Sequence, residues 1–131
     1  MKKIKKTEEE WKKILDPQTF YITRQAGTEK PFSGKYNNEK STGIYCCKCC
    51  NAELFSSETK YDSQSGWPSF YDLLEEKNIT SKIDNSLGKK RIEVLCSNCN
   101  AHLGHLFDDG PQPTGKRYCI NSSSLNLVKS E

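Results

Sequence analysis

The sequence predicts a mainly antiparallel β domain with short helices near its N-terminus and a structural zinc site. Three features of the 131 residues support this fold class. Helical capping and helical spacing of apolar residues occur only near the start. Beyond them, short apolar runs alternate with turn-forming residues, as in antiparallel sheets. Two Cys-x-x-Cys pairs supply four thiols for zinc, which would supplement the modest core of a chain with 34% hydrophobic residues.

The composition limits the classes of protein and partner. The length predicts a single domain over residues 1–131, with residues 1–10 forming a flexible basic segment that leads into the first helix. The net charge of +3, from 20 basic and 17 acidic residues, is too balanced to indicate nucleic-acid binding. We expect a monomer with no nucleic-acid partner.

The distribution of apolar residues and cysteines favours a cytoplasmic protein. No apolar segment approaches the roughly 20 residues that cross a bilayer, and no apolar region of a signal peptide follows the N-terminal lysines. The seven cysteines are an odd number, and two pairs have metal-ligand spacing. This pattern fits a reducing compartment better than a secreted disulfide framework. We expect no membrane partner.

The first helix is predicted from a capping box. Thr7 and Glu10 have the Thr-x-x-Glu spacing in which each side chain binds the backbone N–H of the other residue. An apolar stripe at i, i+3, i+4 spacing follows, formed by Trp11, Ile14 and Leu15. Asp16 ends this helix because the residue before a proline avoids the helical region, and Pro17 can open a second short helical turn. From Phe20 we expect a loop, whose turn signals are Gly27, Pro31 and Gly34.

The strands are expected to be short and separated by frequent turns. A hairpin is the clearest of them, with strands over residues 79–83 and 91–95 on either side of the turn-forming residues 84–88. Residues 44–45 lead into the first cysteine cluster, and short pieces follow at residues 52–55 and 61–70, around Gly66-Trp67-Pro68. The last strand is expected at residues 116–122, with residues 125–128 as an extension of the sheet.

The metal site is indicated by an internal repeat. Residues 47–54 and 96–103 both read Cys-x-x-Cys-Asn-Ala-x-Leu. Two such knuckles that face each other would present four thiolates in a tetrahedron, the geometry that zinc takes. The repeat leaves Cys46 and Cys49 outside and selects the ligands Cys47, Cys50, Cys96 and Cys99. A closed set of four thiolates has no open position for a substrate, so we assign zinc there to folding.

Two other interpretations of the cysteines are disfavoured. Buried cysteines without a metal are the first, and the spacing of the pairs argues against it. A Cys2His2 finger is the second. His102 and His105 follow Cys99 too closely for the roughly 12 intervening residues of that motif.

A strand near the C-terminus carries the candidate nucleophile. Side chains alternate along a strand, so one polar face holds Arg117, Cys119 and Asn121, and the core face holds Tyr118, Ile120 and Ser122. Arg117, about 7 Å away along the strand, would favour the thiolate form of Cys119, which is the reactive form. The alternative is that Cys119 acts only as a small hydrophobic residue, which its polar neighbours disfavour.

Both histidines of the chain precede that cysteine. A turn-forming run at residues 108–115 can fold His102 and His105 back onto Cys119. A thiol and two imidazoles at one site provide a nucleophile with candidate acid and base groups. Either histidine could instead be a hydrogen-bonded structural residue, and His102 could support the zinc knuckle. Trp67, on a loop between glycine and proline, is a candidate pocket wall or else plain core.

Three motifs resemble the B-type methionine sulfoxide reductases. They are residues 65–70 (SGWPSF), 102–111 (HLGHLFDDGP) and 113–122 (PTGKRYCINS). Residues 28–34 (TEKPFSG) and the two Cys-x-x-Cys pairs fit as well. The resemblance extends from about Trp11 to Leu125, nearly the whole chain.

The resemblance implies two antiparallel β-sheets with N-terminal helices, one structural Zn²⁺ ion, and reduction of the R epimer of methionine sulfoxide, mainly in proteins. It implies that Cys119 is the nucleophile and Arg117 supports its thiolate. The residues around the sulfoxide oxygen would be His102, His105 and Asn121, and those around the methyl group Trp67 and Phe107. The thiolate would attack the sulfoxide sulfur while a histidine protonates the oxygen, which leaves methionine and a Cys119 sulfenic acid.

The resemblance also implies partners and a biological role. The partners would be oxidised proteins that carry methionine R-sulfoxide, and thioredoxin or a similar thiol reductant. The role would be protein repair and defence against oxidative stress.

One position departs from the family. Many members carry a resolving cysteine where this chain has Ser65, and a hydroxyl cannot form a disulfide with the sulfenic acid. An external thiol could attack the oxidised Cys119 directly, or Cys46 or Cys49 could serve instead. We favour the direct route, because a cysteine beside a metal knuckle is held at a distance.

A zinc-ribbon module that binds nucleic acid or protein is the main competing interpretation. It explains the four thiolates and the lysines, but neither Cys119 on a polar strand face nor the two histidines. A zinc hydrolase would need a ligand set with an open position, and none is apparent in the sequence.

Overall fold

The computed structural model describes residues 6–85, 88 and 90–130. Two helices open the chain, α1 (Glu8–Ile14) and α2 (Pro17–Arg24). The strands that follow are β1 (Gly43–Cys47), β2 (Glu53–Ser56), β3 (Lys60–Tyr61), β4 (Ser69–Phe70), β5 (Ile79–Asp84), β6 (Arg91–Cys96), β7 (His102–Phe107), β8 (Arg117–Ile120) and β9 (Leu125–Lys129). Short 3-10 turns lie at Ser57–Thr59, Glu76–Asn78 and Ser122–Ser124.

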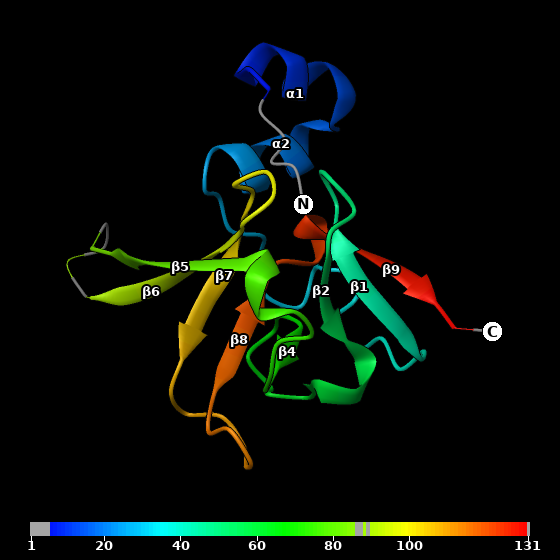
Figure 1. The fold of residues 1–131 in the computed structure, drawn as a ribbon, viewed down its shortest axis with the longest axis vertical. Coiled ribbons are helices and arrows are strands. Elements are labelled where there is room, and N and C mark those ends of the chain that lie inside the picture. The colour runs from blue at the N-terminus through cyan, green and yellow to red at the C-terminus, as the bar shows by residue number, and fades with distance from the viewer. Residues whose placement is uncertain (1–5, 86–87, 89, 131) are drawn as a thin grey trace.

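These strands form two antiparallel sheets, with both helices at one end of the molecule (Figure 1). One sheet has three strands in the order β2-β1-β9, and the other has six in the order β3-β4-β8-β7-β6-β5. The predicted fold class is therefore confirmed in the described residues: the chain is mainly β, with two antiparallel sheets and short N-terminal helices. Neither described helix is long and apolar enough to cross a membrane.

Helix α1 begins at the predicted capping box. The Glu10 N–H donates to Thr7 Oγ1 at 3.2 Å, and the Thr7 N–H donates to Glu10 Oε1 at 3.0 Å. The predicted apolar stripe is wrong at one position, because Ile14 is 62% exposed. The helix packs through Trp11, whose ring lies 4.4 Å from the Arg24 guanidinium carbon. Of the predicted N-terminal segment at residues 1–10, residues 1–5 lie outside the described part of the chain.

Helix α2 is longer than predicted. Asp16 is its N-cap and Pro17 its first residue, as expected, but the loop expected from Phe20 does not begin until after Arg24. Phe20 and Ile22 are buried beneath this helix. Tertiary burial of this apolar side outweighs the modest helix propensity of β-branched residues such as Ile22.

The core lies between the two sheets and is rich in aromatic residues. Phe55 of β2 stacks on Phe70 of β4 with ring centroids 4.4 Å apart, and Tyr45 of β1 meets Phe70 edge-on at 5.1 Å. Tyr118 and Ile120 of β8 are buried on the same side. The predicted core face of this strand is therefore confirmed, so the alternate residues of β8 point away from the core.

The predicted hairpin is present, and two other strand predictions need correction. Strands β5 and β6 pair from Ile79 opposite Cys96 to Asp84 opposite Arg91, while part of the predicted turn lies outside the described residues. The strand expected at residues 116–122 ends at Ile120, because Asn121 caps the 3-10 turn that follows. The segment at 125–128 does form a strand, but it pairs with β1 in the smaller sheet.

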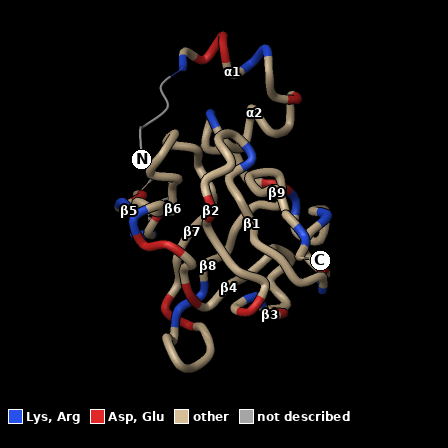
Figure 2. Tube along the Cα trace, turned by 45° about the vertical axis from the view of Figure 1, so that its right-hand side comes forward, with Lys and Arg blue, Asp and Glu red and all other residues tan. Residues whose placement is uncertain are grey.

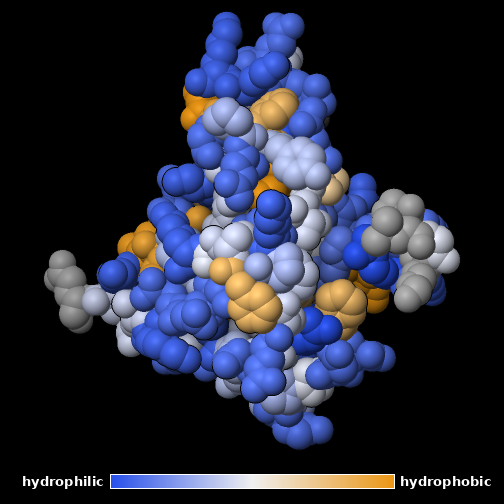
Figure 3. Space-filling model, turned by 180° about the vertical axis from the view of Figure 1, so that it is seen from behind, coloured by the Kyte–Doolittle hydropathy of each residue, from blue (hydrophilic) through white to orange (hydrophobic). Residues whose placement is uncertain are grey.

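The surface is polar and of mixed charge. Lys and Arg positions are interspersed with Asp and Glu positions along the described chain (Figure 2). The face in Figure 3 is mostly hydrophilic, with hydrophobic residues in separate patches. Scattered hydrophobic residues of this kind are ordinary on the surface of a globular domain and do not mark a site.

Candidate functional site

The hairpin of β7 and β8 brings His105 directly opposite Cys119. The turn at residues 108–115 thus folds a histidine back onto the cysteine, as predicted. Gly104 permits the close approach, since a Cβ atom there would overlap the carbonyl oxygen of Cys119. Strand β4 lies on the other side of β8, with Ser69 opposite Cys119.

A β-bulge places both histidines on the same face of the sheet. Val94 of β6 lies opposite Gly104, but Leu95 lies opposite His102, so Leu103 is an extra residue in β7. Side chains three residues apart on a regular strand point to opposite faces. With one extra residue between them, they point to the same face. The ring centroids of His102 and His105 are consequently 5.5 Å apart.

A cavity of about 290 Å³ opens over this face. Six of the predicted catalytic and substrate-binding residues line it: Trp67, His105, Phe107, Arg117, Cys119 and Asn121. Four further residues line it that the sequence did not single out as site residues: Thr28, Ser65, Arg91 and Gly104. His102 is not among the lining residues. It is buried behind His105, with 4% of its surface exposed.

Cys119 is half-buried, and its environment acts on the thiol in two directions. Burial raises the pKa of Cys119 above its ordinary value, whereas the Ser65 hydroxyl and the Arg117 guanidinium lower it by less. Arg117 therefore acts in the expected direction, but desolvation outweighs it and the resting group is a thiol. Two hydrogen bonds, of 2.8 and 3.2 Å, hold Arg117 against Asp109. Its guanidinium also lies 4.3 Å from the centre of the Phe107 ring.

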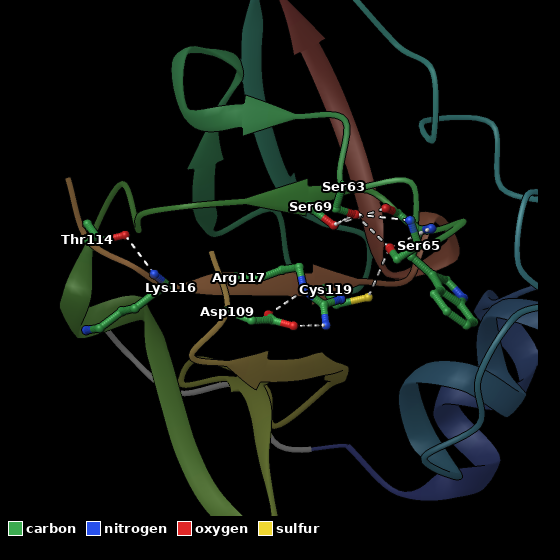
Figure 4. Close-up of polar contacts among 9 residues, drawn as sticks. Ser63, Ser65, Ser69, Asp109, Thr114, Lys116, Arg117 and Cys119 are labelled. Carbon is green, nitrogen blue, oxygen red and sulfur yellow. Dashed lines mark hydrogen bonds and ion pairs between the residues drawn. The ribbon is translucent and has the colours of Figure 1, made fainter. Parts of the chain in front are cut away.

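A chain of serine hydroxyls leads to the sulfur atom (Figure 4). Ser63 Oγ lies 2.7 Å from both Ser69 Oγ and Ser65 Oγ. Ser65 Oγ in turn lies 3.9 Å from Cys119 Sγ. The residue that stands where many relatives have a resolving cysteine is thus in contact with the candidate nucleophile, as a hydrogen-bonding hydroxyl.

Residue Glu29 fixes two walls of the cavity through its backbone. Its N–H donates to Asn121 Oδ1 at 3.0 Å, and its carbonyl accepts from Trp67 Nε1 at 2.9 Å. Asn121 Nδ2 also donates to the Leu103 carbonyl at 3.1 Å. The only sequence signal for Glu29 was its place in the motif at residues 28–34.

Each histidine is paired with a carboxylate that was not identified from the sequence. His102 Nδ1 lies 2.6 Å from Glu93 Oε2, and His105 Nε2 lies 2.8 Å from Asp84 Oδ2. Arg91 Nη2 also binds Asp84 Oδ2, at 3.2 Å. Burial lowers the pKa of His102, against the opposing hydrogen bond and charge of Glu93. The two carboxylates lie on β5 and β6. They could have been identified as partners of the histidines only if the register of these strands with β7 were known.

The predicted metal ligands come together in one cluster. The sulfur atoms of Cys47, Cys50, Cys96 and Cys99 lie within 4.8 Å of one another. Two of the separations are 3.6 and 3.5 Å, close to the roughly 3.8 Å edge of a tetrahedron with Zn–S bonds of about 2.3 Å. These four residues, which are the predicted ligand set, therefore could hold a zinc ion.

The repeated knuckles have the same backbone. Asn51 and Asn100 both adopt a left-handed conformation with φ of 64°. Their N–H groups donate to the carbonyls of Cys47 and Cys96, in each case at 2.8 Å. Asparagine tolerates this conformation better than most residues, which explains why both copies of the repeat carry it.

Sequence similarity to known proteins extends over nearly the whole chain. The family model described as the SelR domain matches residues 15–129. A protein of Methanosarcina mazei named peptide methionine sulfoxide reductase MsrB is 55% identical over 129 residues, which cover 98% of this chain and 92% of that protein. A protein of Pseudomonas fluorescens (strain Pf0-1) with the same name is 56% identical over 131 residues, which cover both chains completely.

A likeness in fold extends further. The crystal structure of the Mis18 'Yippee-like' domain matches 69% of this chain and 98% of that one, with a TM-score of 0.55 and 16% sequence identity. This likeness concerns the fold alone. The sequence matches carry the assignment, and the chain belongs to the SelR family, that of the MsrB-type peptide methionine sulfoxide reductases.

Proposed function

We propose that this protein reduces the R epimer of methionine sulfoxide, mainly in oxidised proteins, with Cys119 as the nucleophile. One observation carries the proposal: a single cavity is lined by a cysteine thiol, a histidine and an asparagine together with two aromatic rings. The polar groups suit a sulfoxide oxygen and the rings suit a methyl group. Sulfur–aromatic contacts of this kind contribute about 0.3–1.5 kcal/mol each.

The reaction transfers one oxygen atom between two sulfur atoms. The Cys119 sulfur attacks the sulfoxide sulfur, a new S–O bond forms at Cys119, and the S–O bond of the substrate breaks. Cys119 is oxidised to a sulfenic acid by two electrons, and the sulfoxide is reduced to the thioether. The thiol proton ends on the transferred oxygen, and a histidine carries it there.

The walls of the cavity account for the choice of epimer. Trp67 and Phe107 would take the methyl group, while His105 and Asn121 would take the oxygen, with His102 behind them. Fixing these two substituents in separate subsites allows only one configuration to present its sulfur to Cys119. Arg117, braced by Asp109 and Phe107, supports the thiolate as it forms.

The four-cysteine cluster would hold one structural Zn²⁺ ion per chain. Such an ion would join the two knuckles and add to the stability of the fold. The chemistry at Cys119 requires nothing from it, because a set of four thiolates leaves no open coordination position.

Recycling of the sulfenic acid would use an external thiol directly. Ser65 Oγ lies 3.9 Å from Cys119 Sγ, but a hydroxyl cannot form a disulfide with the sulfenic acid. Cys46 is buried on β1 in the smaller sheet, and Cys49 lies in the first zinc knuckle. One reductant thiol would therefore form a mixed disulfide with Cys119 and release water, and a second would free Cys119. Thioredoxin or a similar cytoplasmic dithiol, acting on a monomer, fits this scheme.

An assay with separated epimers tests the activity. We expect turnover of peptide-bound methionine R-sulfoxide with dithiothreitol and with thioredoxin, and no turnover of the S epimer. Cys119→Ser should lose all activity but keep zinc. A non-enzymatic zinc-ribbon module would show no turnover before or after this substitution, and turnover of the S epimer would contradict the subsite assignment.

Mass spectrometry after one turnover without reductant tests the recycling route. The direct route predicts that Cys119 sulfenic acid is trapped by dimedone and that no disulfide involving Cys119 accumulates. A Cys119–Cys46 or Cys119–Cys49 linkage would overturn it.

A further inference from the structure

The two histidines of the site are held through different ring nitrogens. Glu93 meets His102 at Nδ1, 2.6 Å away, and Asp84 meets His105 at Nε2, 2.8 Å away. An ionised carboxylate only accepts hydrogen bonds, so the ring nitrogen that faces it carries the hydrogen. The neutral histidines are then opposite tautomers, with the hydrogen on Nδ1 in His102 and on Nε2 in His105.

Asp84 is itself fixed from a neighbouring strand. It lies opposite Arg91 in the β5–β6 pair, and Arg91 Nη2 donates to the same Oδ2 atom that His105 binds. The side chains of Asp84 and His105 are 17% and 11% exposed, so solvent screens this pair only weakly. Arg91 holds the carboxylate in place beside the ring.

We propose that Asp84, held by Arg91, is a positioning residue that fixes His105 as the Nε2–H tautomer and directs its Nδ1 at the substrate oxygen. The proton reaches the sulfoxide oxygen from Nδ1 of the protonated ring. Glu93 holds His102 in the other tautomer behind it. The catalytic half of this proposal rests on the proposed function, whereas the assignment of the tautomers does not.

The charged and titratable groups around His105 favour Asp84 in this role. Cys119 faces the ring from β8 and Glu93 from β6, each directly opposite in the strand pairing, and His102 comes from the same strand. Cys119 is a thiol at rest, and Glu93 is occupied by His102 and by Lys82, 3.7 Å away. Asp84 is therefore the carboxylate that is paired with His105 and can orient its ring.

Nuclear magnetic resonance tests the tautomers without any turnover. The chain has two histidines, so long-range ¹H–¹⁵N spectra of the full-length protein above pH 8 contain two ring patterns. We expect one Nδ1–H and one Nε2–H pattern. Asp84→Ala should alter only the Nε2–H pattern, and the matched variant Glu93→Gln only the Nδ1–H pattern. Two rings with the same tautomer, or a spectrum that Asp84→Ala leaves unchanged, would overturn the assignment.

The pH dependence of turnover tests the catalytic half. Asp84→Asn keeps the size of the side chain and removes its charge, so the protonated ring loses stability. The alkaline limb of the kcat profile on peptide R-sulfoxide should move to lower pH, with kcat at pH 8 reduced about tenfold and KM little changed. A limb that does not move, or one that moves only in Glu93→Gln, would reject Asp84 and assign the donor to His102. If the wild-type protein lacks activity, the proposed function fails, while the spectra still decide the positioning.

Discussion

The cluster of four cysteines and the cavity at Cys119 contain the same functional group in opposite surroundings. In the cluster, each sulfur has three other sulfur atoms within 4.8 Å, and Arg24 covers one side by donating to the Cys99 carbonyl at 3.0 Å. At Cys119, the neighbours are a hydroxyl and a guanidinium, and the sulfur lines a cavity. Surroundings of the first kind could hold a metal ion, and those of the second kind present a single sulfur to a cavity.

The difference lies in the backbone that carries each cysteine. The knuckles bend the chain through a left-handed asparagine, which turns two thiols in each towards a common centre. Cys119 lies in a regular strand, whose alternation places it opposite the core face. The neighbours of a ligand thiol in a knuckle are therefore the other thiols of the cluster. The neighbours of a thiol in the strand are the side chains of the adjacent strands, and these set its reactivity.

The largest expected effect follows from breaking the cluster. Cys99→Ala removes one ligand, and structural zinc contributes about 10–16 kcal/mol of apparent binding energy, as much as the whole stability of a typical domain. We expect the variant to lose bound zinc, measured by elemental analysis, and to lose the cooperative thermal transition, measured by circular dichroism. Cys119→Ser is the matched control and should retain both. A Cys99→Ala protein that melts like the wild type would show that the cluster does not stabilise the fold.

The next prediction adds a thiol beside Cys119. In Ser65→Cys the new sulfur starts near the present 3.9 Å separation, and a disulfide of about 2.05 Å requires a loop movement of roughly 2 Å. We expect two free thiols to be lost after one turnover with R-sulfoxide and no reductant, as measured by thiol titration. Ser63→Cys, which bonds to Ser65 and Ser69 and not to Cys119, is the control. Loss of only one thiol in Ser65→Cys, that of Cys119 as its sulfenic acid, would mean that the loop cannot close.

The sequence predicted those parts of the fold and site that depend on local chemistry. The capping box at Thr7 is a contact within one turn, and the choice of Cys47 over Cys46 as ligand followed from a repeat visible in the chain. The alternation around Cys119 likewise needs only the strand itself. The capping box and the alternation of burial in this strand were confirmed, because no distant residue decides them.

The parts that were missed depend on contacts between distant segments. Helix α2 continues past Phe20 because Ile22 is buried by the rest of the fold. Strand β7 escaped notice because its bulge places His102 and His105 at a spacing that does not alternate. Asp84 became a partner of His105 only through the register of three strands, 21 residues away in the chain.

A smaller effect is expected from the cation near Cys119. Burial raises the pKa of this thiol and Arg117 partly opposes the rise, so Arg117→Met should raise the pKa further. Because only the thiolate reacts with iodoacetamide, the midpoint of the alkylation rate against pH should move to higher pH, with a slower reaction at pH 7. Lys116→Met, on the adjacent exposed position, is the control for loss of positive charge. A midpoint that moves down, or that moves equally in both variants, would contradict a local role for Arg117.

The smallest effect is expected at Cys49, which lies in the first knuckle but outside the ligand set. Cys49 is partly exposed and lies outside the four cysteines whose sulfurs lie within 4.8 Å of one another, so a serine there should remove no metal ligand. We expect Cys49→Ser to bind zinc as the wild type does, with a change in unfolding free energy within about 0.5 kcal/mol, measured by urea denaturation. Cys50→Ser, one residue further, should lose zinc. If instead Cys49→Ser lost zinc and Cys50→Ser kept it, the ligand in the first knuckle would be Cys49. The two knuckles would then not bind the metal through equivalent positions.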